Sequence, residues 1–160
     1  MQGNLATLWY QEGRVAGALA ASGQAEQELS RLGDQPWLAR VVNNTGVFLQ
    51  ALGRPAEAYV AYHRAAMMYM QSRERPYACS ALINCVEALL DQGKLVEASA
   101  VMGQVDGMLK ELDPPPEWLL REVDVQAARL AAVTQQGTGS SSSSPAPPIL
   151  ALAPQRYKLS

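Results

Sequence analysis

The sequence of 160 residues contains few of the residue types on which catalytic and metal sites depend. It has one histidine, His63, and two cysteines, Cys79 and Cys85. Two cysteines without a second closely spaced pair do not match a zinc site, and a histidine with no partner placed beside it does not match a catalytic triad. We therefore expect no enzyme activity, no metal and no cofactor. Both cysteines are interpreted as small buried hydrophobic residues.

The sequence also lacks an excess of charge of either sign. Its 13 Lys and Arg residues stand against 15 Asp and Glu residues, which gives a net charge of −2 at pH 7. A nucleic-acid-binding surface needs clustered cations that displace counterions from phosphates. We therefore expect no nucleic acid among the partners.

Long hydrophobic runs are absent too. No stretch of the sequence approaches the ~20 apolar residues needed to span a bilayer. The segment MQGNLATLWYQEGR does not combine a basic region with an apolar one, as a secretory signal does. We therefore expect no membrane contact and a cytoplasmic location.

What the sequence does contain is a repeat. Four residue types recur at intervals of 40 residues, and all four share one phase. Chance does not readily produce such a pattern, and a fixed period of this size indicates stacked structural repeats. The recurring residues are Asn4, Asn44 and Asn84; Gly13, Gly53 and Gly93; Ala18, Ala58 and Ala98; and Pro36, Pro76 and Pro116.

Each repeat is predicted to be a pair of helices joined by a turn. Around Gly53, amphipathic helical patterns cover residues 37–51 and residues 55–70. Glycine permits the left-handed backbone at which a helix commonly ends, and Pro55 begins the second helix where its missing N–H is not needed. We therefore predict an all-α solenoid with helical hairpins at about 1–35, 36–75 and 76–115.

The periodic residues fade after the third hairpin. A further helix is predicted at 117–136, in which Asp124 takes the place of the periodic asparagine. We interpret this helix as a cap that ends the array of residues 1–136. Gly, Ser and Pro dominate residues 137–160, so this segment is predicted to be a flexible tail.

The repeat resembles the tetratricopeptide repeat (TPR) family. The segments NTGVFLQALGRPAEAYVAYHRAA and NCVEALLDQGKLVEASAVMGQV resemble its helix-turn-helix pattern. The period of 40 rather than about 34 residues resembles its long-helix subclass, seen in kinesin light chains and in polarity adaptors named for Leu-Gly-Asn repeats. The resemblance implies a right-handed superhelix of about three hairpins. Its first helices line a concave groove, and a non-catalytic adaptor or scaffold of this kind binds an extended or helical segment of another protein there.

The resemblance also implies which side chains face the groove. An asparagine amide carries both a donor and an acceptor, so a row of asparagines can hold a peptide backbone. In the alternative interpretation, the asparagines bond the neighbouring helix and fix the angle between repeats. The candidate peptide-binding residues are Asn4, Tyr10, Arg40, Asn43, Asn44, Val47, Gln50, Asn84, Glu87 and Asp91.

A second function stays open, in which the chain is a structural fragment of a longer TPR array. Met1 stands three residues before Asn4, whereas Pro36 and Pro76 precede their asparagines by eight. A terminal repeat without a cap exposes an apolar edge. On this interpretation the chain self-associates through its exposed terminal repeat, or packs into a larger complex.

Overall fold

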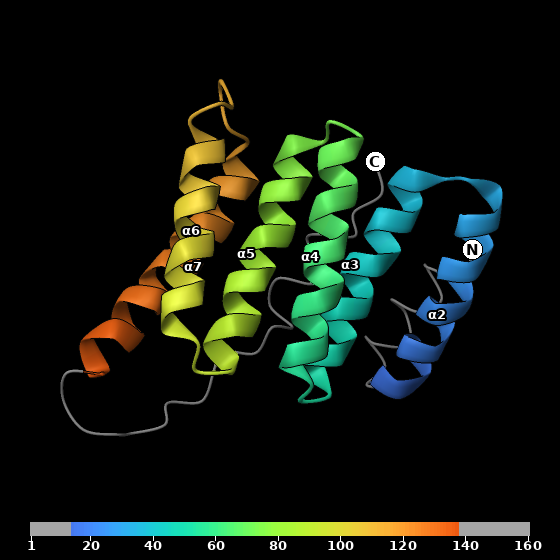
Figure 1. The fold of residues 1–160 in the computed structure, drawn as a ribbon, viewed down its shortest axis with the longest axis horizontal. Helices are drawn as coiled ribbons and strands as arrows, with labels where there is room; N and C mark the ends of the chain where they lie inside the picture. Colours follow the sequence, from blue (N-terminus) through green and yellow to red (C-terminus); the bar gives the residue numbers. More distant parts are fainter. Residues whose placement is uncertain (1–13, 138–160) are drawn as a thin grey trace.

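The computed structural model describes residues 14–137, and each regular element in this range is an α-helix. Each helix packs against the next one in the chain, and the series crosses the molecule from α2 to α7 (Figure 1). The all-α prediction is therefore confirmed for these residues. The helices are α2 (Val15–Leu32), α3 (Gln35–Ala51), α4 (Pro55–Gln71), α5 (Arg75–Asp91), α6 (Leu95–Leu109) and α7 (Glu117–Gln136). The predicted first helix of the array and the predicted tail from residue 138 onward lie outside the described residues.

Glycine and proline mark the helix ends as predicted. Gly53 and Gly93 follow α3 and α5 with φ angles of 73° and 72°, in the left-handed region that glycine enters without a steric cost. Gly33 has the same geometry after α2, and Arg73 adopts it after α4 with a φ of 61°. Helices α3, α4 and α5 each carry a proline in their first turn, where no backbone hydrogen bond is lost.

The last helix departs from the 40-residue period. Helix α7 begins 42 residues after α5, whereas α5 begins 40 residues after α3. Counted from the start of the helix, Gln126 takes the place that Asn84 has in α5. The prediction that Asp124 takes this place is wrong by two residues, and Asp124 is accordingly exposed while Gln126 is 2% exposed.

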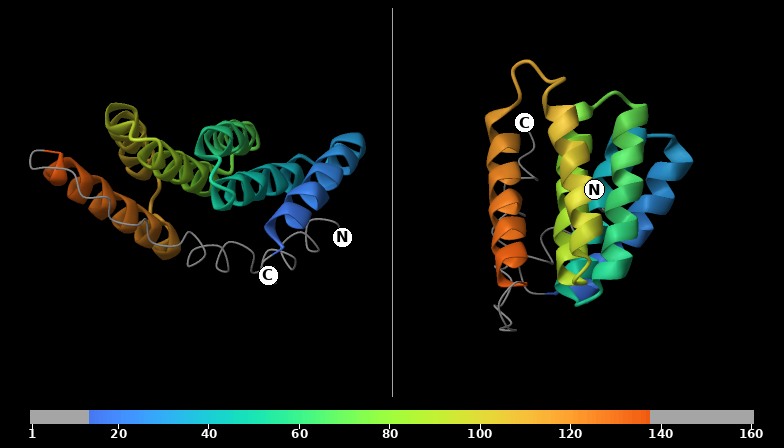
Figure 2. Two further views of the ribbon diagram at one scale, coloured as in Figure 1. Left: turned by 90° about the horizontal axis from the view of Figure 1, so that it is seen from below. Right: turned by 60° about the vertical axis from the view of Figure 1, so that its left-hand side comes forward.

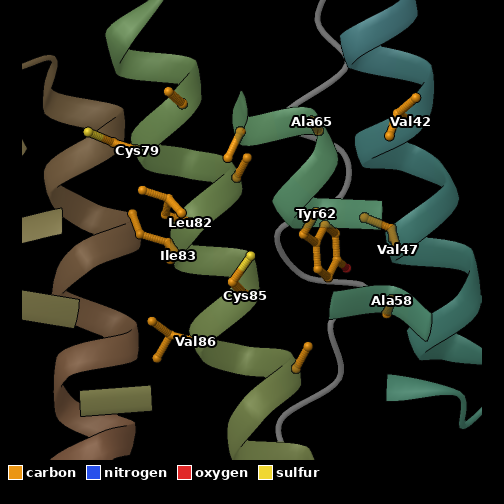
Figure 3. Packing of buried hydrophobic residues seen from close by; sticks show 14 of the residues in the cluster. Val42, Val47, Ala58, Tyr62, Ala65, Cys79, Leu82, Ile83, Cys85 and Val86 are labelled. Atoms are coloured by element: carbon orange, nitrogen blue, oxygen red, sulfur yellow. The ribbon is translucent and has the colours of Figure 1, made fainter. Parts of the chain in front are cut away.

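The hydrophobic core runs along the whole series of helices. Ala18, Ala58 and Ala98 are 0% exposed, and such small residues let neighbouring helix axes approach closely. Larger side chains fill the space beside them, and Figure 3 shows Tyr62 of α4 between α3 and α5. Leu119 joins the same core from α7, so the last helix is packed onto the array.

No helix between residues 14 and 137 is both long enough and apolar enough to cross a membrane.

A candidate peptide-binding face

Polar side chains from α3, α5 and α7 meet on one face of the array. Helix α7 contacts both α5 and α6, and α5 lies between α3 and α7 (Figure 2). The three helices are joined there by side-chain hydrogen bonds rather than by apolar contacts alone. We call this surface the polar face, and it consists of Asn43, Asn44, Gln50, Ser80, Asn84, Glu87, Asp91, Glu122, Gln126 and Arg129.

Two side-chain hydrogen bonds join α3 to α5. Nδ2 of Asn84 donates to Oδ1 of Asn43 over 3.1 Å, and Nε2 of Gln50 donates to Oδ2 of Asp91 over 2.6 Å. The same number of residues separates the two bonded positions on each helix, so α3 and α5 run parallel and stay aligned over two turns. Tyr62 of α4 adds a third bond, because its hydroxyl donates to Oε1 of Gln50 over 3.0 Å.

Helices α5 and α7 are joined in the same way. Oγ of Ser80 donates to Oε2 of Glu122 over 2.6 Å. Two turns further along, Nη2 of Arg129 donates to Oδ1 of Asp91 over 2.5 Å, and its Nη1 lies 3.6 Å from Oε1 of Glu87. One guanidinium therefore sits between two carboxylates, and the side chains of Arg129 and Glu87 are only 15% and 3% exposed.

Two amide oxygens on the polar face are buried without a hydrogen-bond partner. They are Oδ1 of Asn84, a residue that is 0% exposed, and Oε1 of Gln126, a residue that is 2% exposed. Nη1 of Arg129 is also buried and makes no hydrogen bond within the usual distance. Buried polar atoms are nearly always paired in folded proteins, so an unpaired group in a native structure calls for an explanation.

The structure brings five of the predicted site residues into hydrogen-bonding or ionic contact. These side chains come from the two first helices α3 and α5, as the resemblance implies for a peptide-binding face. The five residues are Asn43, Gln50, Asn84, Glu87 and Asp91. Asn4 and Tyr10 lie outside the described residues.

The other predicted residues on α3 have separate surroundings. Asn44 is 7% exposed and lies next to Asn43 on the polar face. Arg40 places its guanidinium carbon 4.6 Å from the centre of the Trp37 ring, in a cation–π contact. Val47 is 1% exposed and belongs to the hydrophobic core, so its contacts are with the interior of the array.

The polar residues of α7 were not among the predicted site residues. Glu122, Gln126 and Arg129 recur at spacings of four and three residues, which place them on one side of the helix. This spacing was a usable signal. It went unnoticed because the 40-residue period was extended into α7 and directed attention to Asp124, which is exposed.

The two thiols lie in the core and away from the polar face. Cys79 and Cys85 are free and 0% exposed. Burial raises the pKa of Cys79 to about 11 and that of Cys85 to about 12, because an apolar environment disfavours the thiolate. Thiols that keep their proton are poor nucleophiles and poor metal ligands. Within residues 14–137, no group of three His, Cys, Asp or Glu residues is placed to hold a metal ion.

No protein-family model matches the chain, and neither does any curated protein.

Proposed function

We propose that the chain is a non-catalytic interaction module, an adaptor or scaffold of the TPR type, whose polar face binds an extended or helical segment of another protein. The observation that carries the proposal is the alignment of amide and carboxylate side chains from successive parallel helices on one face. A peptide backbone offers alternating donors and acceptors, and amide side chains can bond either kind. The 40-residue repeat with its glycine turns supports the TPR assignment.

The spacing of the helices suits an extended peptide. Packed helices lie ~8–10 Å apart, and an extended chain advances ~3.3 Å per residue. Side chains on neighbouring first helices therefore match every third residue of a peptide that crosses them. In the proposed function α3, α5 and α7 line the concave side of a right-handed superhelix, in the cytoplasm, and Asn44 and Gln50 are the first residues that a peptide meets on α3.

A structural role is the second candidate, and one contact favours it. The amide nitrogen of Asn84 is engaged by Asn43, and Asn84 is fully buried. An amide used in this way fixes the distance and angle between α3 and α5. In this role the chain is part of a longer array or self-associates, and the polar face holds repeats together without binding a peptide.

Selection from a library of random 12-residue peptides displayed on phage tests the proposed function. We expect a set of related peptides to be enriched on the folded full chain and to bind it in fluorescence anisotropy. Asn44→Ala should weaken this binding about tenfold, the effect of losing one good hydrogen bond, while helicity and melting stay unchanged.

Gln104→Ala provides the matched control, because Gln104 is an exposed amide on the second helix α6. This variant should bind like the wild type. Failure to enrich any peptide, or equal binding by Asn44→Ala, would refute the proposed function. Sedimentation over a range of concentrations tests the structural role separately, since that role predicts an assembly that grows with concentration.

A further inference from the structure

We propose that the polar face takes up a positively charged side chain, Arg or Lys, of the bound peptide between α5 and α7 at the level of Asn84 and Gln126. This inference rests on the proposed function, because it names the chemistry of the peptide. Its basis is the juxtaposition of two buried, unpartnered amide oxygens with an excess of carboxylates.

The alignment of α5 and α7 places the two amide oxygens opposite each other. Ser80 contacts Glu122, and seven residues later on each helix Glu87 faces Arg129. Asn84 and Gln126 each come four residues after the first of these contacts, and both are buried. Residues four apart lie one above the other on the same side of a helix, so Asn84 and Gln126 occupy the same turn between α5 and α7.

The direction of the Asn84 amide supports this placement. Its nitrogen donates toward α3, to Asn43. Nitrogen and oxygen leave an amide carbon in different directions, so Oδ1 lies on the side of the amide away from Asn43. Oδ1 of Asn84 and Oε1 of Gln126 are both acceptors, and a group that satisfies them together must carry at least two N–H or O–H donors. A guanidinium offers five such donors and an ammonium three.

Charge selects a cation among the possible donors. The polar face carries the carboxylates of Glu87, Asp91 and Glu122, and Arg129 is its one described cation. A neutral donor such as a primary amide would satisfy the oxygens but leave this negative excess. A carboxylate would add to the excess and bring no donor. A basic side chain supplies donors and charge together.

The solvent-exposed end of the polar face gives a path for such a side chain. The Asp91 and Arg129 side chains are 19% and 15% exposed, whereas Asn84 and Gln126 lie deeper along the same two helices. Lys and Arg have long apolar stems that can lie against buried surface while the charged end reaches a distant partner. An incoming guanidinium at Asp91 takes over part of the role that Arg129 has in the unbound chain.

The peptide selection described above tests this inference when the selected sequences are aligned. We expect one position to be dominated by Arg or Lys. A selected peptide whose Arg is replaced by citrulline, which keeps the shape and loses the charge, should bind the wild-type chain about tenfold more weakly. This comparison changes the peptide alone, so the folding of the protein does not affect its outcome.

Variants of the chain then locate the site. Gln126→Leu, and Asp91→Asn combined with Glu122→Gln, should each abolish the preference for Arg over citrulline. Glu97→Gln on α6 is the control and should keep it. Enriched peptides without a basic position would overturn this inference and leave the proposed function standing, and so would a preference that survives in both variants. A selection that enriches nothing contradicts the proposed function itself, and the inference falls with it.

Discussion

The ring of Tyr62 lies directly against the backbone of Gly46. A Cβ atom at Gly46 would be 2.5 Å from Cε1 and 2.6 Å from Cδ1 of that ring. Tyr62 is 1% exposed, and its hydroxyl is bonded to Gln50, so the ring has little freedom to move aside. One repeat later the equivalent pair is Val86 and Met102, in which a larger residue faces a flexible one. The α3–α4 hairpin therefore depends on the missing side chain at Gly46.

Gly46→Ala should destabilise the protein although alanine is the better helix former. Overpacking a filled core costs ~1–3 kcal/mol, and replacing glycine by alanine inside a helix gains at most ~1 kcal/mol. We expect a net loss of about 1 kcal/mol in the free energy of unfolding, measured by urea denaturation. Gly103→Ala in α6 is the control, because no atom lies within 4 Å of a Cβ there and only the gain should remain. Equal stabilisation by both substitutions would contradict the close contact.

Arg73→Gly should stabilise the protein. Arg73 follows α4 with a φ of 61°, whereas the equivalent turn after α2 has Gly33 at 71°. A residue with a Cβ pays about 1 kcal/mol or more to adopt the left-handed region, and glycine does not. We expect the free energy of unfolding to rise by about 1 kcal/mol in urea denaturation. Gly53→Ala, at a φ of 73° in open space, should lower it by a similar amount, and a neutral result for both would argue against strain at these turns.

The helix boundaries could be predicted from the sequence because the residues that set them act locally. Glycine and proline restrict their own backbone, so the predicted start of a helix at Pro55 agrees with α4. The same period failed at α7, where the connection from Leu109 to Glu117 moves the helix by two residues. Loop length is a local property too, but its effect on which side chains face α5 appears only in three dimensions.

The pairing of side chains on the polar face could not be predicted. Asn44 and Asn84 share the period, yet Asn84 bonds Asn43. Which of two adjacent residues meets the next helix depends on the rotation of α3 about its axis. That rotation follows from packing between helices, including the contact of Gly46 with Tyr62. A sequence pattern gives the side of the helix that is buried, and the individual partner is decided by packing.

Asn43→Ala should cost more stability than Asn44→Ala. Removing the Asn43 oxygen leaves Nδ2 of the fully buried Asn84 without its acceptor, which costs ~1–3 kcal/mol. The side chain of Asn44 is not part of this pair, so its loss should cost less than about 1 kcal/mol. A double-mutant cycle of Asn43→Ala and Asn84→Ala in chemical denaturation measures the coupling. We expect about 0.5–1.5 kcal/mol, and simple additivity would contradict a direct hydrogen bond.

Arg129→Met should strongly destabilise the protein by leaving carboxylates uncompensated. Glu87 is 3% exposed, and Asp91 also bonds the lost guanidinium. Removing one partner of a buried charge pair costs about 3 kcal/mol, because the remaining charge stays out of water. Thermal and urea denaturation measure the loss.

Two comparisons show whether charge is the cause of that loss. Arg121→Met removes an exposed pair with Glu117 on the same helix and should change the free energy of unfolding by less than about 1 kcal/mol. Adding Glu87→Gln to Arg129→Met should recover part of the stability, since it removes one buried charge. If the added substitution destabilises further, packing rather than charge explains the effect of Arg129.

The buried thiols should make the protein lose stability at alkaline pH. Burial raises the pKa of Cys79 to about 11 and of Cys85 to about 12, whereas a thiol in an unfolded chain ionises near pH ~8.5. The folded chain therefore holds protons that the unfolded chain has released. The stabilisation is complete below pH ~8.5 and declines as the pH rises through the folded pKa values, by up to about 1.4 kcal/mol per pH unit for each thiol. Cys79→Ala combined with Cys85→Ala should show a shallower decline between about pH 9 and 11 in urea denaturation, whatever its stability at neutral pH. Equal slopes for this variant and the wild type would show that other groups cause the alkaline loss.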